Sequence, residues 1–147
     1  MPEPSRQYPT RPVVGVGAVV LTGEGRVVLV RRGQPPLAGE WSLPGGVLEL
    51  GEGMTAGIRR EVREETGLEV EVGPVVDVFE HISRDDEGRV LYHYVIVDYL
   101  CRARPGTACA SSDVTELAEV LPAELGAYAL RDTAVEMIDR ALRLARP

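Results

Sequence analysis

Residues 46–68 read GVLELGEGMTAGIRREVREETGL. Apolar residues recur in it at the spacing of one helical face, and Gly67 stands where a C-terminal cap is typical. We therefore predict a helix over Met54–Thr66, in which Gly57 costs about 1 kcal/mol relative to alanine. Its expected buried stripe has three apolar residues at spacing four: Met54, Ile58 and Val62.

The predicted helix also groups three glutamates on one face. Glu61, Glu64 and Glu65 stand at i, i+3 and i+4, where side chains of a helix are neighbours. Like charges at this spacing repel by roughly 0.2–0.5 kcal/mol per pair, and a bound cation would remove that repulsion. The alternative is an exposed face whose acids pair with the arginines of the same helix: Arg59, Arg60 and Arg63.

A cation held by this face would be a hard divalent ion. The donors are carboxylate oxygens, and no cluster of histidine or cysteine lies near them in the sequence. Mg²⁺ usually takes a few carboxylates, several waters and substrate phosphates. We therefore predict Mg²⁺ or Mn²⁺ as the cofactor.

The whole stretch resembles the Nudix box, written G-x5-E-x7-R-E-U-x-E-E-x-G-U, where U is a bulky aliphatic residue. Every defined position matches and both gaps have the right length. Chance gives such a match in about 10⁻⁵ of chains of this length. The preceding segment, LAGEWSLPGG, is similar to the usual lead-in. The matching residues are Gly46, Glu52, Arg60, Glu61, Val62, Glu64, Glu65, Gly67 and Leu68.

The resemblance implies an α/β/α sandwich that hydrolyses a nucleoside diphosphate linked to another moiety. It also implies metal ligands, which are Glu61, Glu64, Glu65 and the Gly45 carbonyl. Glu52 and Arg60 would brace the loop against the helix and belong with Glu61 and Glu64 to the catalytic set.

The base that takes the proton of the attacking water stays open between Glu61, Glu64 and an acid near Asp113 and Glu116.

Strand patterns flank this stretch on both sides. Val13–Leu21 and Arg26–Arg31 are β-branched runs joined by a Thr-Gly-Glu-Gly turn. Val70–Ile82 and Arg89–Arg102 alternate as the strands of a second hairpin do. This order of strands and helices indicates a mixed sheet flanked by helices.

The two ends of the chain have different character. Residues 1–12 contain four prolines and are expected to form an extended arm without chemistry, whereas residues 13–147 form the Nudix hydrolase domain. A C-terminal helix is predicted over Arg131–Ala145, with Thr133 and Glu136 at the spacing of a capping box. Its expected buried face consists of Val135, Ile138, Leu142 and Ala145.

Composition excludes several classes of function. With 16 basic and 23 acidic residues, the 147-residue chain has a net charge of −7, which disfavours binding to a nucleic-acid polymer. All basic residues are arginine, so lysine-dependent phosphate loops and Schiff bases are excluded. The longest apolar run is far shorter than the roughly 18 residues of a membrane span. No signal-peptide pattern opens the chain, and the cytoplasm is the expected location.

Several residues outside the box are candidates for substrate contact. Arg31 and Arg32 end a strand beside the loop and suit a phosphate, with a surface ion pair as the alternative. Trp41 is either a stacking partner for a base or a packing anchor. Asp113 and Glu116 occupy a stretch where similar proteins place an extra acid, and otherwise begin a helix or strand.

The resemblance favours ADP-ribose or a nucleotide sugar as substrate. A pyrophosphatase for oxidised or noncanonical nucleoside triphosphates is the alternative enzyme, and its products would be pyrophosphate and a nucleoside monophosphate. A non-catalytic sensor of a nucleotide sugar is a third hypothesis, which the complete set of box carboxylates disfavours. Homodimers are common among similar proteins, but no feature of the sequence decides this point.

Overall fold

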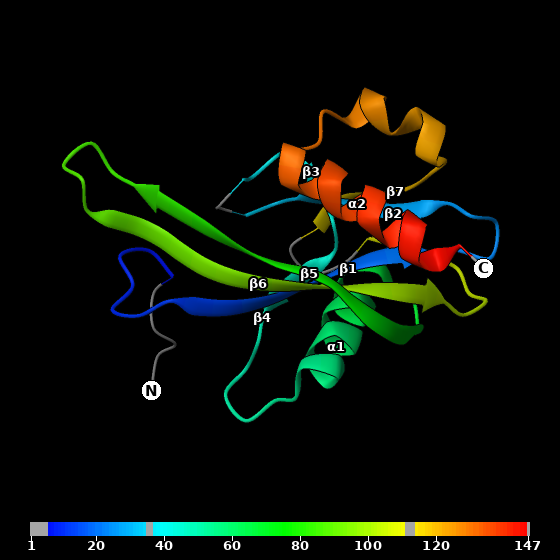
Figure 1. The fold of residues 1–147 in the computed structure, drawn as a ribbon, viewed down its shortest axis with the longest axis horizontal. Helices are drawn as coiled ribbons and strands as arrows, with labels where there is room; N and C mark the ends of the chain where they lie inside the picture. The colour runs from blue at the N-terminus through cyan, green and yellow to red at the C-terminus, as the bar shows by residue number, and fades with distance from the viewer. Residues whose placement is uncertain (1–5, 35–36, 111–113, 147) are drawn as a thin grey trace.

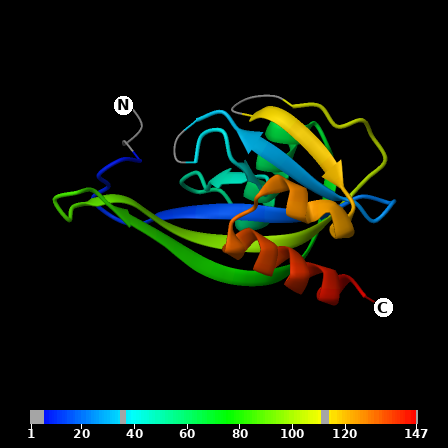
Figure 2. The same cartoon turned by 90° about the horizontal axis from the view of Figure 1, so that it is seen from above.

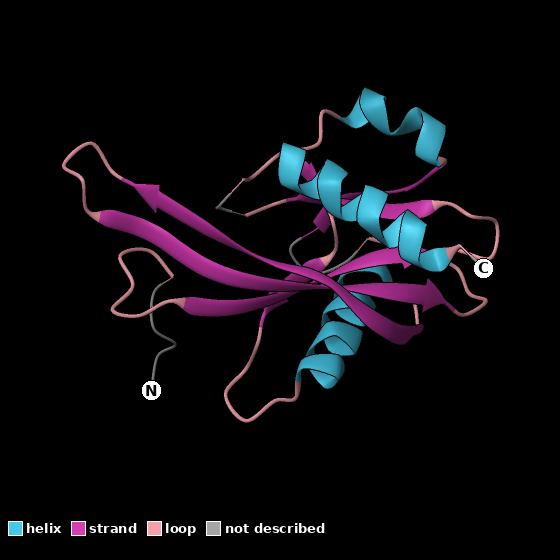
Figure 3. Cartoon of the chain, in the orientation of Figure 1, coloured by secondary structure: helices cyan, strands magenta, loops and turns pink. Residues whose placement is uncertain are grey.

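A mixed β-sheet runs through the middle of the molecule, and one long helix covers each of its faces (Figures 1 and 3). The computed structural model describes residues 6–34, 37–110 and 114–146. The predicted α/β/α sandwich is confirmed. In chain order, the elements are β1 (Val13–Leu21), β2 (Val27–Arg32), β3 (Trp41–Ser42), β4 (Gly45–Val47), α1 (Met54–Thr66), β5 (Val70–Arg84), β6 (Val90–Ala103), β7 (Val114–Val120), the 3₁₀ helix η1 (Pro122–Tyr128) and α2 (Asp132–Ala145).

The central strand β1 has different neighbours along its length. It pairs in parallel with β6 from Val13↔Tyr94 to Leu21↔Arg102. On its other side it meets β2 only at Leu21↔Val27, and β4 pairs with its first half in antiparallel register. The hairpin predicted from Val13 to Arg31 is therefore confirmed as a turn, but its strands separate beyond the turn because β4 occupies the place beside β1.

The second predicted hairpin is confirmed, and it extends past both helices (Figures 1 and 2). Residues 6–12, which precede β1, lie against it. The backbone N–H of Tyr8 donates to the carbonyl of Leu91 over 2.9 Å, and its hydroxyl donates to Asp85. The guanidinium of Arg89 covers the Tyr8 ring at 4.8 Å. This part of the N-terminal segment is thus packed on the same chain.

Helix α1 begins and ends where the sequence predicts. Ile58 and Val62 are fully buried against the sheet, and Gly67 takes the left-handed conformation of a cap, with φ 73°. Met54 departs from the predicted buried stripe because it is 43% exposed. The first turn of α1 lies farther from the sheet than the rest of the helix in Figure 1, and Met54 packs against neither cluster of the hydrophobic core.

Helix α2 covers the other face with Met137, Ile138 and Ala141, which pack into the second half of the core. The predicted face is wrong at Val135, which is 44% exposed. The capping box is wrong as well, since Thr133 lies inside the helix and the cap residue is Arg131, without a side-chain cap. The guanidinium of the cap residue Arg131 donates to Glu40 over 2.9 Å.

Strand β7 was not predicted, and it forms the edge of the sheet next to β2. Its pairing brings Glu116 opposite Arg31 and Leu117 opposite Val30.

Within the described part of the chain, no helix is both long enough and apolar enough to span a bilayer.

Candidate active site

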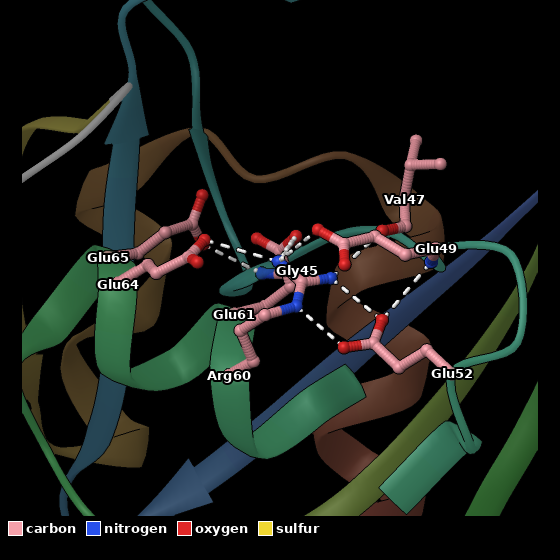
Figure 4. A network of polar contacts seen from close by, with 8 residues as sticks. All are labelled: Gly45, Val47, Glu49, Glu52, Arg60, Glu61, Glu64 and Glu65. Carbon is pink, nitrogen blue, oxygen red and sulfur yellow. Dashed lines mark hydrogen bonds and ion pairs between the residues drawn. The ribbon is translucent and has the colours of Figure 1, made fainter. Parts of the chain in front are cut away.

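Arg60 lies at the centre of a network of carboxylates beside α1 (Figure 4). Its Nε and Nη2 atoms donate to both oxygens of Glu52, over 2.7 and 2.9 Å. Its Nη1 atom donates to Glu61 over 2.9 Å and to Glu64 over 3.2 Å, and Nη2 also reaches the carbonyl of Val47. The predicted bracing pair of Glu52 and Arg60 therefore joins the loop after β4 to the helix.

The network holds more negative than positive charge. Three carboxylates hydrogen-bond to the single guanidinium of Arg60, and Glu49 lies 3.8 Å from it. The hydrogen bond from Arg60 lowers the pKa of Glu52 to about 2. Burial raises the pKa of Glu61 despite the opposing effect of Arg60. This excess of carboxylate charge favours a bound cation.

Strand β4 is fixed to the same helix by two glycines. The backbone N–H of Gly45 donates to Oε1 of Glu65 over 2.8 Å, and Glu65 is only 6% exposed. The carboxylate of Glu61 lies against Gly46, where any side chain would overlap it. The backbone of β4 consequently approaches the glutamates more closely than a residue with a Cβ would allow.

The structure explains why glycine occupies position 57 inside helix α1, which the sequence alone did not explain. A Cβ at this position would lie 2.7 Å from Cδ1 of Leu48 and 3.0 Å from Oε1 of Glu52. Helix propensity alone favours Gly57→Ala by about 1 kcal/mol. We expect the variant instead to lower Tm, because the methyl group displaces the side chains of Leu48 and Glu52 and disturbs the ion pair of Glu52 with Arg60. Thermal unfolding followed by circular dichroism checks this result.

Gly126→Ala is the matched control for that prediction. Gly126 lies in η1, and a Cβ built on it meets no atom within 4 Å. The control variant should keep or raise Tm, since alanine reduces the freedom of the unfolded chain. A higher Tm for Gly57→Ala than for the wild type would refute the crowding at Gly57.

Two cavities adjoin the carboxylate network. The first, called here the helix groove, has a volume of about 660 Å³, and its lining includes residues 9–11 and four residues of α1: Arg60, Glu61, Glu64 and Glu65. The second, called here the sheet cavity, has a volume of about 180 Å³ and lies among β1, β5, β6 and the start of α2. The residues that line both are Arg6, Arg32, Gly45, Gly46 and Val47.

A family model described as the NUDIX domain matches residues 11–141, which include α1, β4 and most of both cavities. The chain belongs to the Nudix family. The predicted membership is thereby confirmed, and the sequence from Gly46 to Leu68 is its Nudix box.

Individual relatives agree with this assignment. The chain is 33% identical over 126 residues to a MutT-like protein of Streptomyces ambofaciens, covering 86% of this chain and 75% of that protein. It is 33% identical over 89 residues to an ADP-ribose pyrophosphatase of Methanocaldococcus jannaschii, covering 60% of this chain and 52% of that protein. The crystal structure of a MutT Nudix hydrolase from Burkholderia pseudomallei superimposes with a TM-score of 0.75 at 28% identity, covering 88% and 98% of the two chains.

The donors of the Nudix box fit a divalent metal by their chemistry. Glu61, Glu64 and Glu65 supply oxygen atoms only, on one side of α1 next to the Gly45 backbone (Figure 4). Among the described residues, no three acidic, histidine or cysteine side chains form a ready cage for a metal ion. Mg²⁺ does not need one, because it keeps several waters and binds substrate phosphates. The box glutamates are therefore suitable ligands for a hydrated ion.

The predicted substrate residues of this Nudix domain separate into two groups. Arg32 and Trp41 line the sheet cavity. Arg31 and Glu116 instead bind each other at 2.9 Å, and Arg31 also donates to the carbonyl of Gly39. Neither lines the two cavities, so the surface ion pair is the arrangement that the structure shows. Asp113 lies outside the described residues.

The sequence analysis missed several residues of the cavities, among them Arg6, Arg131 and Asp98. Arg6 comes from the segment that was expected to carry no chemistry, yet it lines both cavities. Arg131 was treated only as the start of a helix, and it lines the sheet cavity. Asp98 lies in the apolar run VIVDYL of β6, and this interruption was the available signal.

Proposed function

We propose that this Nudix protein is a Mg²⁺- or Mn²⁺-dependent hydrolase of nucleoside diphosphate derivatives, with ADP-ribose or a nucleotide sugar as substrate. The observation that carries the proposal is that a groove lined by the box glutamates adjoins a cavity with apolar walls, and that two arginines line both. The similarity to an ADP-ribose pyrophosphatase of M. jannaschii supports this choice of substrate.

The residues of this chain have separate tasks in the proposed reaction. Arg6 and Arg32, where the two cavities adjoin, bind the phosphates. Arg60 keeps Glu61 and Glu64 on the groove side of α1, and Glu52 keeps Arg60 in place. A metal ion held by Glu61, Glu64, Glu65 and the Gly45 carbonyl would neutralise phosphoryl charge and activate water.

The bond changes follow from this arrangement. The oxygen of a water molecule forms a bond to one phosphorus of the diphosphate, and the bridging P–O bond breaks. The carboxylate of Glu61 or Glu64 accepts the proton of the water. ADP-ribose would thus give AMP and ribose 5-phosphate. The division of the chain into an arm, residues 1–12, and a catalytic domain, residues 13–147, belongs to the same proposal.

A product-resolved screen tests the proposed function. The purified protein is incubated with ADP-ribose, nucleotide sugars, dinucleoside polyphosphates and oxidised deoxynucleoside triphosphates, with Mg²⁺, with Mn²⁺ and with a chelator. We expect metal-dependent release of AMP from ADP-ribose. Release of pyrophosphate and a nucleoside monophosphate from a triphosphate would refute the proposed substrate and favour a nucleoside triphosphate instead. Tight binding of a nucleotide sugar without turnover would instead favour the hypothesis that the protein is a non-catalytic sensor.

A further inference from the structure

Asp98 is a buried acid outside the Nudix box. It lies in the middle of β6, is 2% exposed, and lines the sheet cavity rather than the helix groove. Among the residues that the structure describes, none donates a hydrogen bond to its carboxyl group and no cation pairs with it. The neighbouring acid on β5, Asp77, pairs with Arg140 of α2. The carboxyl group of Asp98 faces the sheet cavity, so a ligand in that cavity can form hydrogen bonds with it.

The strand opposite Asp98 leaves room for this side chain. Gly17 of β1 is its register partner, and a Cβ at Gly17 would overlap Oδ1 of Asp98. The missing side chain at Gly17 therefore allows the carboxyl group to sit over β1, where it lines the cavity.

The walls around Asp98 suit a flat ring. Trp41, Phe79 and Ile96 contribute apolar surface, and Trp41 is fixed edge-on against Tyr128 with 5.1 Å between the ring centroids. Gly45 and Gly46 line the same cavity and also the helix groove, which holds the box glutamates. A ring in the sheet cavity is thus connected to the place where the phosphates are proposed to bind.

We propose that Asp98 is the residue that determines base specificity, by hydrogen bonding to the amino-bearing edge of an adenine ring in the sheet cavity. This proposal rests on the proposed function and names the half of the substrate that the cavity holds. Adenine presents an amino donor beside a ring-nitrogen acceptor. A neutral carboxyl group presents one acceptor and one donor, which complement that edge. Burial favours the neutral form, since it raises the pKa of Asp98 to about 7.

The test measures binding without turnover. Calorimetry on the full chain without divalent metal compares AMP with purine riboside 5′-monophosphate, which lacks only the amino group. The wild type should bind AMP about tenfold more tightly or better, because loss of a partner leaves Asp98 unpaired. Asp98→Asn keeps one donor and one acceptor and should keep this preference. Asp98→Leu should bind both nucleotides equally.

Asp139→Asn, at an exposed position of α2, is the control and should behave as the wild type. Equal affinity of the wild type for the two nucleotides, a preference for AMP that survives in Asp98→Leu, or tighter binding of GMP than of AMP would each overturn the proposal. If Asp98→Leu does not fold, Asp98→Ala takes its place and should likewise bind both nucleotides equally. A preference for AMP without hydrolysis of ADP-ribose would refute the proposed substrate and leave the role of Asp98 intact.

Discussion

Replacing Glu64 or Glu65 by glutamine should lower kcat more than 100-fold on the substrate found in the screen. Each change removes one negative charge from the donors proposed to hold the metal, and with it the stabilisation of phosphoryl charge in the transition state. Glutamine retains an oxygen that accepts the N–H of Gly45, which Glu65 binds at 2.8 Å, so the fold should persist. Steady-state kinetics at saturating Mg²⁺, together with Mn²⁺ titration calorimetry, measures the effect.

Glu24→Gln provides the matched control for those two variants. The Glu24 side chain is 84% exposed, lines neither cavity, and lies 3.6 Å from Arg26 in an exposed ion pair. This variant should keep kcat within about twofold of the wild type, since exposed pairs contribute little. Turnover close to the wild-type rate in both Glu64→Gln and Glu65→Gln, with unchanged Mn²⁺ affinity, would remove these residues from the ligand set.

The second large effect is a fall in stability with rising pH that depends on Asp98. Burial, and then the charge of Asp77, raises the pKa of Asp98 from 3.8 to about 7. Between these values the unfolded chain loses this proton while the folded chain keeps it. The free energy of unfolding therefore falls as pH rises, by about 4 kcal/mol in total. Below pH 4 and above pH 7, the ionisation of Asp98 causes no further change in the free energy of unfolding.

Asp98→Asn removes this pH dependence because its amide does not titrate. The Tm of the variant minus that of the wild type should be close to zero near pH 4 and rise by several degrees by pH 8. Burial lowers the pKa of His81, and this histidine is present in both proteins. A difference in Tm that stays constant from pH 4 to pH 8 would show that Asp98 ionises normally in the folded protein.

Local patterns gave the parts of the fold that depend on neighbours in sequence. The bounds of α1 and the three glutamates on its face follow from helical spacing, and the β5–β6 hairpin follows from alternation. Strand β7 was missed because its sequence, VTELAEV, is rich in helix formers. It is a strand because it pairs with β2, and such tertiary pairing overrides propensity.

The candidate site was predictable to a similar extent. The resemblance to the Nudix box anticipated the pairing of Glu52 with Arg60, which the structure shows. Arg31 and Glu116 are 85 residues apart, and only the register of β2 with β7 brings them together. The position of Asp98 in a cavity depends in the same way on the register of β6 with β1, which no local pattern encodes.

The two cavities are built mainly from different elements, and this separation bears on how new activities arise in this fold. The box glutamates come from α1, whereas the distal walls of the sheet cavity come from β5, β6 and the start of α2. Changes at Phe79, Ile96 or Asp98 leave every box residue in place. A library randomised at these three positions should therefore yield variants with altered base preference that retain metal-dependent turnover, so selection can widen the substrate range without rebuilding the catalytic machinery.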